Sequence, residues 1–488
     1  MIDIFAGRMT EARDFRERRW LALGLLCMAQ FVVVLDASIV NVALPSIGEA
    51  LDFSQGNLSW VVNAYVLTFG GFLLLGGRLA DLLGRRRVFM FGLVLFAIAS
   101  LAGGFAESEG VLIAARAVQG LGAAILSPAA LSIVTTTFTD GAERNKALGV
   151  WGAVAGSGGA AGVLLGGVLT DGLGWEWVLW VNVPIGIAAA AIAPTLLADT
   201  RSEAATRSFD VAGAFSVTAG LSVLVYALVD ATDAGWGSTQ TIGLLALAVV
   251  LLAAFVVIEM RSDAPLVPFR IFRLRTLTGA NIVGILIGAS LFSMFFFISL
   301  YMQQVLDYSA IKAGLSYLPL AVAIILTAGV ASQLVTKIGF KPVLAAGMLF
   351  IAAGLIWFGQ ISVGGSYASD ILGPSLLAAI GLGLAFVTST IAAVSGVDAH
   401  EAGLASGLIN TSQQVGGALG LAVLATVANS TTNDATGPLP NALTEGFQAA
   451  FLAGAGIALL GFVLTLVLIR SSDSRAHMQL GAAEATAP

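Results

Sequence analysis

The chain has 488 residues, of which 58% are hydrophobic and only 11% are charged, and its mean hydropathy is +0.93. This composition excludes a water-soluble protein of such length, because a soluble fold needs a charged surface to face water. The formal net charge of −6 says little about partners, since the position of each charge matters more in a membrane protein than the sum. The single cysteine, Cys27, cannot form an intramolecular disulfide.

Long apolar stretches, separated by short polar segments, run along the whole chain. Each is roughly 18 to 27 residues long, enough to cross a hydrocarbon core of about 30 Å as a helix rising about 1.5 Å per residue. We therefore predict an all-α membrane protein with fourteen transmembrane helices. Their approximate ranges are 20–44, 58–77, 88–105, 111–134, 147–170, 178–197, 211–229, 241–258, 277–300, 315–335, 343–361, 371–397, 404–427 and 447–469.

The basic residues predict the orientation of these helices. With the amino terminus in the cytoplasm, 21 of the 23 Lys and Arg residues fall in cytoplasmic segments, as the positive-inside rule requires. Lys312 then lies outside and Arg116 lies within the membrane. Both termini are therefore predicted to be cytoplasmic, in a multi-pass protein of the inner, cytoplasmic membrane.

Two longer polar connections divide the predicted helices into six, two and six. Weak internal symmetry supports this division, because Glu143, Ala147 and Gly149 have the same spacing as Glu401, Ala405 and Gly407. Such repeats are typical of secondary transporters that rock one half against the other. The predicted parts are a cytoplasmic segment 1–19, a six-helix bundle 20–198, a two-helix insertion with cytoplasmic loops 199–275, a second six-helix bundle 276–470 and a cytoplasmic tail 471–488.

Two charged residues stand clearly inside apolar stretches, Asp36 in the first and Arg116 in the fourth. An ionisable side chain at this depth costs several kcal/mol, so it is a candidate for function. Both lie roughly 8 to 12 Å from the outer ends of their helices, which would allow them to pair. A carboxyl group whose cationic neighbour moves can switch between binding and releasing a proton. The alternative is a permanent ion pair that only holds two helices together.

The energy source is narrowed by what the sequence lacks. A P-loop requires a lysine followed by Ser or Thr, whereas the four lysines here are followed by Ala, Ala, Ile and Pro. Both histidines, His400 and His477, fall outside the predicted helices, so no metal site is expected in the membrane. We expect no enzyme activity, no cofactor and no nucleic-acid partner, and we expect the proton gradient to supply the energy.

Three motifs resemble those of the major facilitator superfamily, specifically its fourteen-helix drug:proton antiporter family, over residues 15–470. A loop motif runs from Gly77 to Arg87 as Gly-Arg-Leu-Ala-Asp-Leu-Leu-Gly-Arg-Arg-Arg. The first helix carries Leu-Asp-Ala-Ser-Ile-Val-Asn-Val-Ala-Leu-Pro from Leu35 to Pro45, and Arg116 is followed by Gln119 and Gly120. The resemblance implies the major facilitator fold and a role for Arg116 in proton coupling, and Asp36 is the candidate proton carrier because it is a carboxylate within the membrane.

The loop motif implies a gate on the cytoplasmic side. Asp81 at the end of the second helix is expected to face the positive amino-terminal end of the thirteenth helix. The gating residues implied by the resemblance are Gly77, Asp81, Gly84, Arg85 and Arg87. The arginines equally suit simple anchoring beside anionic lipid. The corresponding loop of the second half has Thr336 in place of the acid, so we expect the gate to be asymmetric.

The fifth helix is rich in glycine, a feature that the family associates with antiport. The implied residues are Gly152, Gly156, Gly162, Gly166 and Gly167. Val163 stands where the family has a proline after Gly162, which weakens the inference to antiport. General close packing of small residues is the alternative.

A mixture of amides and aromatic residues forms the candidate substrate cavity. We predict Asn41, Asn63, Tyr65, Gln119, Phe295, Gln303, Asn410 and Gln413 as cavity residues. Such a lining suits amphipathic, partly aromatic compounds. We also expect membrane lipids to surround the protein and the chain to act as a monomer. A multidrug exporter, a dedicated exporter of one antibiotic, metabolite or lipid, an uptake carrier and a channel all remain open, and the fourteen-helix resemblance favours the first.

Overall fold

The computed structural model describes residues 2–53, 58, 60–138, 141–198, 210–262, 265–398 and 401–475, with side chains described from residue 18 onward apart from a few positions within helices. All regular structure in these residues is helical, and 13 helices are long and apolar enough to cross a membrane. A further helix contains a shorter apolar segment, Ala212–Leu228. Residues 199–209 of the predicted connection between Ala198 and Asp210, and most of the predicted tail, lie outside the described residues.

The first half of the chain forms long helices whose breaks follow the local sequence. Gly84 has φ +102° and separates two of them, and Gly174 with φ +109° ends another, because both conformations favour a residue without a side chain. The helices are α1 (Ile2–Ala50), α3 (Trp60–Leu83), α4 (Arg85–Gly104), α5 (Glu109–Thr137), α6 (Gly141–Leu173), α7 (Trp177–Trp180) and α8 (Asn182–Leu196).

The remaining helices follow the same pattern. Gly235 and Gly339, with φ +87° and +82°, separate successive helices at sharp turns. The elements are α9 (Val211–Ala234), α10 (Thr239–Arg261), the 3-10 helix η1 (Phe269–Arg273), α11 (Arg275–Leu300), the π-helix η2 (Tyr301–Val305), α12 (Ala310–Ser316), α13 (Leu318–Ile338), α14 (Phe340–Phe358), the π-helix η3 (Tyr367–Leu372), α15 (Gly373–Val394), α16 (Ala402–Asp434) and α17 (Leu439–Leu468).

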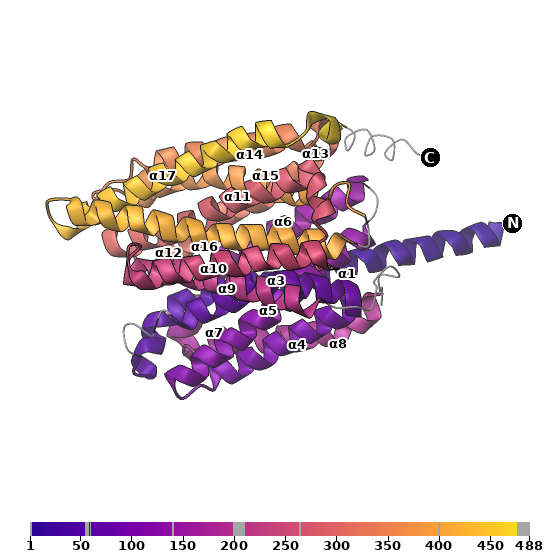
Figure 1. The fold of residues 1–488 in the computed structure, drawn as a ribbon, viewed down its shortest axis with the longest axis horizontal. Coiled ribbons are helices and arrows are strands. Elements are labelled where there is room, and N and C mark those ends of the chain that lie inside the picture. Colours follow the sequence, from indigo (N-terminus) through magenta and orange to yellow (C-terminus); the bar gives the residue numbers. More distant parts are fainter. Residues whose placement is uncertain are drawn as a thin grey trace.

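Two groups of helices lie side by side (Figure 1). In one group α3 and α4 pack on α5, α1 packs on α6, and α8 packs on α4. In the other, α11 packs on α16, and α14 packs on α15 and α17. The groups meet at two seams, one between α6 and α13 and one between α3 and α16. The hairpin of α9 and α10 lies between the groups, with α9 against both α3 and α16.

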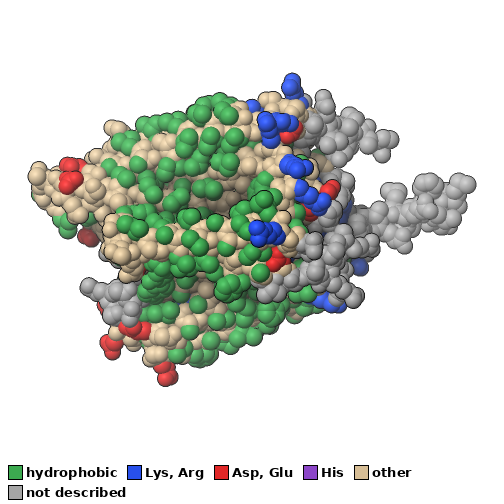
Figure 2. Space-filling view, viewed as in Figure 1, with side chains coloured by type: hydrophobic (Ala, Val, Ile, Leu, Met, Phe, Trp, Pro, Cys, Tyr) green, Lys and Arg blue, Asp and Glu red, His purple; other side chains and the backbone are tan. Residues whose placement is uncertain are grey.

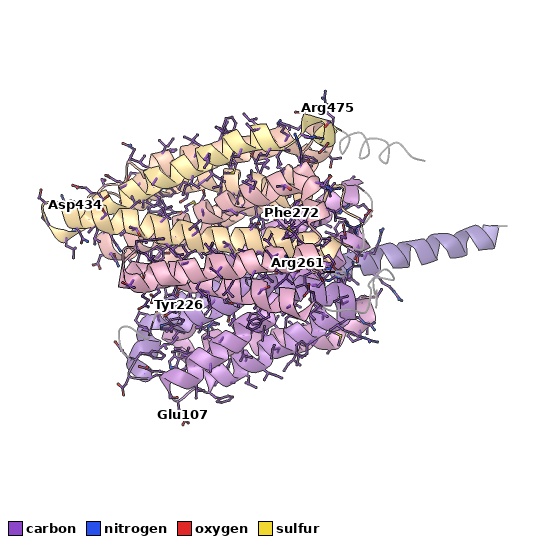
Figure 3. All side chains as sticks on the ribbon, viewed as in Figure 1. Glu107, Tyr226, Arg261, Phe272, Asp434 and Arg475 are labelled. Carbon is purple, nitrogen blue, oxygen red and sulfur yellow. The ribbon has the colours of Figure 1, made fainter. Side chains whose placement is uncertain are left out.

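Charge is distributed unequally between the two ends of the bundle. Lys and Arg side chains gather at one end, and a broad apolar band separates them from acidic side chains at the other (Figure 2). We call these the basic end, which carries Arg261 and Arg475, and the acidic end, which carries Glu107 and Asp434 (Figure 3). Large apolar side chains such as Phe215 and Val467 are each 72% exposed. Such a surface suits hydrocarbon and not water.

Candidate functional site

Asp36 on α1 and Arg116 on α5 form an ion pair inside the first group of helices. The Arg116 Nη1 donates to Asp36 Oδ2 at 2.5 Å, and both residues are 0% exposed. The structure thus brings together the two residues whose equal depth suggested a pair. Because both charges are removed from water, they are stable here only as long as each keeps its partner.

Neutral polar side chains from three helices complete the surroundings of the carboxylate. Asp36 Oδ1 accepts hydrogen bonds from Gln119 Nε2 at 2.8 Å and from Asn182 Nδ2 at 2.7 Å. Both amides also donate to Ser100 Oγ, at 3.0 Å each, and Ser100 donates to the Leu179 carbonyl at 2.7 Å. The carboxylate is therefore held by three donors, one charged and two neutral, in a cluster closed to solvent.

The guanidinium group of Arg116 has further partners on α3 and on its own helix. Its Nε donates to the Val61 carbonyl at 3.0 Å, and Nη1 also donates to Gln119 Oε1 at 2.7 Å. Its carbon atom lies 4.4 Å from the centre of the Tyr65 ring, a distance suited to a cation–π interaction. The buried Nη2 finds no hydrogen-bond partner among the described residues, so one donor is available for another acceptor.

Close helix contacts bring these side chains together. A Cβ on Gly120 would overlap with the Tyr65 carbonyl, so glycine at this position lets α5 approach α3. A Cβ on Gly103 would come within 3.0 Å of Leu179, at the contact that positions Ser100. Tyr65 is fixed in turn by donating its hydroxyl proton to the Val33 carbonyl at 3.1 Å. Glycine and tyrosine thus set the distances within the cluster.

The glycine-rich helix α6 uses different faces for different neighbours. Gly162 and Gly166 lie against α1, where added Cβ atoms would come within 2.6 Å of the Leu35 carbonyl and 2.8 Å of the Ile39 carbonyl. Gly152 and Gly167 lie against α15 and α12 of the other group. The predicted residue Gly156 lies outside the positions whose surroundings are described. The helix therefore packs closely on both halves, as small residues allow in a membrane.

Asp81 lies at the basic end of α3, beside the first turn of α16. Its Oδ1 accepts from Arg85 Nη2 at 3.2 Å, and the carboxylate faces the backbone N–H of Leu404. Its Oδ2 has no complete hydrogen bond among the described residues. Gly77 is close enough to α16 that a Cβ on Gly407 would lie 3.8 Å from its Cα. An acid thus faces a helix amino terminus across one seam, with the geometry predicted for the gate.

The remaining residues of the loop motif have separate surroundings. Gly84 provides the positive φ between α3 and α4, and Arg87 is exposed. Arg86 donates from Nη1 to the Leu197 carbonyl at 3.1 Å, beyond the end of α8. Unpaired carbonyl groups at a helix end attract cations, so Arg86 stabilises the local structure.

The second seam has a neutral side-chain hydrogen bond where the first seam has the carboxylate. Asn145, in the first turns of α6, donates from Nδ2 to Thr336 Oγ1 at 2.9 Å, at the basic end of α13. Arg144 adds a hydrogen bond from Nη2 to the Val394 carbonyl at 3.2 Å. Both halves therefore place a helix end against the start of a helix in the other half, and a carboxylate is present at one of these contacts.

The candidate cavity residues have different surroundings in the structure. Tyr65 and Gln119 belong to the buried cluster, while Asn41 and Gln303 are exposed and Asn63 is half-buried. Phe295 stacks on Tyr317 with ring centres 5.4 Å apart. Asn410 and Gln413 on α16 each have a buried amide nitrogen without a hydrogen-bond partner among the described residues. These two amides are therefore unsatisfied donors inside the protein in this conformation.

Sequence reasoning missed Ser100 and Asn182, although both contact the buried cluster directly. Each is 0% exposed, Ser100 on α4 and Asn182 on α8, and neither residue was among the predicted site residues. A detectable signal existed, since Asn182 is an amide within a predicted transmembrane helix. Neutral polar residues are common in membrane helices, however, so this signal is much weaker than that of a charge.

Comparison with known proteins places the chain in a family. The profile of the Major Facilitator Superfamily matches residues 26–421. The cephamycin export protein CmcT of Amycolatopsis lactamdurans is 44% identical over 92% of this chain and 92% of its own length. The puromycin resistance protein pur8 of Streptomyces alboniger is 39% identical over 96% of this chain and 95% of its own length.

A solved structure shows the same fold at low sequence identity. The proton:xylose symporter XylE aligns with a TM-score of 0.67 and 13% identity, over 96% of this chain and 99% of its own. At this identity the likeness establishes the helical arrangement and leaves the cargo open. The chain therefore belongs to the Major Facilitator Superfamily, as a multi-pass transporter of the cell membrane.

Proposed function

We propose that this protein exports amphipathic drugs or antibiotics across the cytoplasmic membrane in exchange for protons. Its full-length relatives include an antibiotic export protein and an antibiotic resistance protein, which supports export as the direction of transport. The proposal includes fourteen transmembrane helices arranged six, two and six, cytoplasmic termini at the basic end, and action as a monomer. The basic end is assigned to the cytoplasm because Lys and Arg collect on that side of a membrane.

The sealed ion pair of Asp36 and Arg116 is the observation that carries proton coupling. As drawn, the pair has no net charge and both partners are 0% exposed. A proton on Asp36 would remove the counter-charge of Arg116 and leave a buried cation in a medium of low dielectric. Because a guanidinium group cannot lose its proton, it must then gain water or another acceptor. Protonation thus favours a conformation in which this cluster opens.

The contact between Asp81 and α16 supplies a conformational switch for the same cycle. It joins the two halves at the basic end, so it favours the conformation closed toward the cytoplasm. Opening toward the cytoplasm requires the carboxylate to leave the helix terminus. Proton binding near the acidic end and this contact at the basic end would then favour opposite faces of one alternating-access cycle.

Substrate binding is assigned to the uncharged half of the interior. Asn410 and Gln413 offer unpaired amide nitrogens, and Phe295 and Tyr317 offer stacked rings. This combination binds amphipathic molecules through stacking and a few hydrogen bonds. The hydrogen bonds of the Tyr317 hydroxyl, with Ser299 and with the Phe295 carbonyl, involve no carboxylate, so the cargo need not compete with the proton for one site.

The test uses purified protein in liposomes that contain a pH-sensitive dye, with drug added under an imposed pH gradient. Asp36→Asn is expected to abolish drug-dependent proton movement and concentrative transport, because the amide cannot exchange a proton. Glu445→Gln removes an exposed carboxyl group on α17 and serves as the matched control, with unchanged transport expected. If Asp36→Asn liposomes still exchanged protons for drug at the normal rate, Asp36 would be a purely structural partner of Arg116.

A dedicated exporter of one compound is a second candidate, since each of the two relatives is named for one antibiotic. The same liposomes separate the two possibilities when they are challenged with cationic, neutral and anionic compounds. A dedicated exporter would release protons with one chemical class alone. Proton release with several classes is expected from the multidrug exporter.

A further inference from the structure

An amphipathic groove runs between α6 and α13, on the outer surface of the seam between the halves. It encloses about 620 Å³ and is lined by residues between Ala142 and Ser157 on α6 and between Ile325 and Lys337 on α13. At its basic end stand Lys146 and Lys337, both exposed. The rest of its wall is mostly small or apolar. Neither the ion-pair cluster nor the stacked rings belong to this groove.

The floor of the groove is a direct contact between the two halves of the protein. A Cβ on Gly149 of α6 would come within 2.8 Å of Ser332 on α13, so the two helices touch there. Anything bound in the groove therefore contacts both halves at once. Because α6 and α13 must separate at the basic end when the protein opens toward the cytoplasm, a bound molecule would favour the closed arrangement.

The other seam, between α3 and α16, is covered by the two-helix insertion. Tyr226 of α9 stacks on Trp60 with ring centres 5.4 Å apart, and Trp236 donates to Thr426 Oγ1 at 2.5 Å. A Cβ on Gly71 of α3 would overlap with Ser222 of α9. Within the described residues the insertion packs on α3 and α16 and not on α6 and α13, so the seam of α6 and α13 is the one that we take to face lipid.

The dimensions of the groove match one leaflet of a bilayer. Its lining spans fifteen residue steps along α6, which corresponds to about 22 Å of helix. Half a hydrocarbon core and one head-group layer together measure about 20 to 22 Å. The lysines stand at the head-group end of this span and the apolar wall extends toward the middle of the bilayer. This order of polar and apolar surface is that of a phospholipid.

The charge of the groove selects the head group. The described residues that line it include two lysines and no Asp or Glu, and the nearby Glu143 is paired with Arg19 at 3.2 Å. Lys146 lies 5.0 Å from the centre of the Trp20 ring. No carboxylate among the described lining residues neutralises its charge. Gln333 and Thr336 add neutral hydrogen-bonding groups beside the lysines. Lysines near a membrane surface attract anionic lipid.

We propose that this groove binds one anionic phospholipid of the cytoplasmic leaflet, with its phosphate between Lys146 and Lys337 and one acyl chain along α6 and α13. The lipid bridges the two halves and stabilises the arrangement closed at the basic end. This site is separate from the proposed drug cavity, so it holds whether or not the protein exports drugs.

Native mass spectrometry of the purified full-length protein, titrated with dioleoylphosphatidylglycerol or dioleoylphosphatidylcholine, measures the binding. We expect one tightly retained phosphatidylglycerol and a rise in melting temperature that phosphatidylcholine does not produce. The variant Lys146→Gln/Lys337→Gln is expected to lose about thirtyfold in affinity for this lipid, the sum of two lysine contributions. The control Arg261→Gln/Arg475→Gln makes the same charge change at the basic end with residues that do not line the groove, and unchanged retention is expected.

A second variant tests the apolar part of the groove. Gly329 lies in the wall, and a Cβ there would meet no atom within 4 Å, so Gly329→Leu fills the groove without disturbing the helix. Gly456 on α17 is equally open and lies outside the groove, which makes Gly456→Leu the matched control. Loss of retention in Gly329→Leu and retention in Gly456→Leu would support the site.

Three results would overturn the proposal. Equal retention of both lipids would show that the lysines do not select the head group. Undiminished phosphatidylglycerol in the double lysine variant, or in Gly329→Leu, would place the lipid elsewhere. Displacement of the lipid by drug in direct competition would make the groove an entry route for cargo.

Discussion

Removing either partner of the Asp36–Arg116 pair should destabilise the protein far more than removing both. Asp36→Asn leaves the guanidinium with the Val61 carbonyl, Gln119 and the Tyr65 ring, but without a counter-charge. Breaking a buried pair in this way costs about 3 to 5 kcal/mol. Arg116→Gln leaves a carboxylate with two amide donors, and this carboxyl group can still become neutral by binding a proton. The loss in Arg116→Gln should therefore be the smaller of the two.

The double variant Asp36→Asn/Arg116→Gln contains no buried charge and keeps side chains of similar size. Its amides can bond to Gln119, Asn182 and each other, so we expect a loss of about 1 kcal/mol, well below the sum of the two single losses. The coupling free energy between the positions is then several kcal/mol. None of the three variants should exchange protons for drug, because the carboxyl group or its switchable partner is missing.

The measurement is a double-mutant cycle on protein purified in one detergent, with unfolding followed by denaturant titration. Glu445→Gln and Arg475→Gln provide a control cycle, for which additivity within about 0.5 kcal/mol is expected. Both residues are exposed, Glu445 near the start of α17 and Arg475 after its end. Additive losses at positions 36 and 116 would refute the argument, because they would show that the two charges do not stabilise each other.

Three further predictions concern the contacts between helices. Asp81→Asn should lower the export rate about tenfold without changing the order of substrate affinities, measured in liposomes, because a carboxylate at a helix terminus contributes up to about 2 kcal/mol. Thr336→Asp should place a second acid against the start of α6 and slow opening toward the cytoplasm, seen as slower export with an unchanged KM. Gly162→Leu should lower stability by about 1 to 3 kcal/mol through overlap with α1, whereas Gly172→Leu on the same helix should not, since space is open there, and thermal unfolding separates the two.

Hydropathy located the helices well because the bilayer imposes one simple condition, an apolar run of sufficient length. Thirteen of the fourteen predicted segments correspond to helices long and apolar enough to span, and the seventh corresponds to α9 with its shorter apolar segment. Details within segments were not predictable in this way. The segment 178–197 divides at Val181 into α7 and α8, and the segment 315–335 begins in α12 before α13. Such breaks depend on packing, to which average hydropathy is insensitive.

The lengths of two helices were also underestimated at their carboxyl-terminal ends. α1 continues to Ala50 and α5 to Thr137, beyond their predicted apolar runs. Helices extend past the hydrocarbon wherever backbone hydrogen bonding remains favourable, so polarity alone does not end them. The turn at Gly84, in contrast, was predictable, because a glycine between two apolar runs favours a turn. In the structure Gly84 has φ +102°, a conformation that suits few other residues.

The contact of Asp36 with Arg116 followed from depth and charge alone, since a buried charge needs a partner and each residue offered the other. Its neighbours Ser100 and Asn182 did not follow, because a neutral side chain costs little in a membrane helix and has many possible partners. Their role depends on where α4 and α8 meet α1, which is a property of the packed bundle. Sequence thus located the charges of the site and the fold located the groups that hold them.

The two halves of the protein differ in the charge of the polar groups discussed above. In the first half lie the buried acid, its arginine and the carboxylate of Asp81, for which we propose a gating role. In the second half, Thr336 makes a neutral contact with Asn145 across the seam, and the unpaired amides of Asn410 and Gln413 are neutral too. Under the proposed mechanism, changes in ionisation act on Asp36 and Asp81 of the first half, while the amides of the second half bind cargo without a change of charge. Substitution of Asn410 or Gln413 is then expected to change the cargo and to leave proton coupling through Asp36 intact.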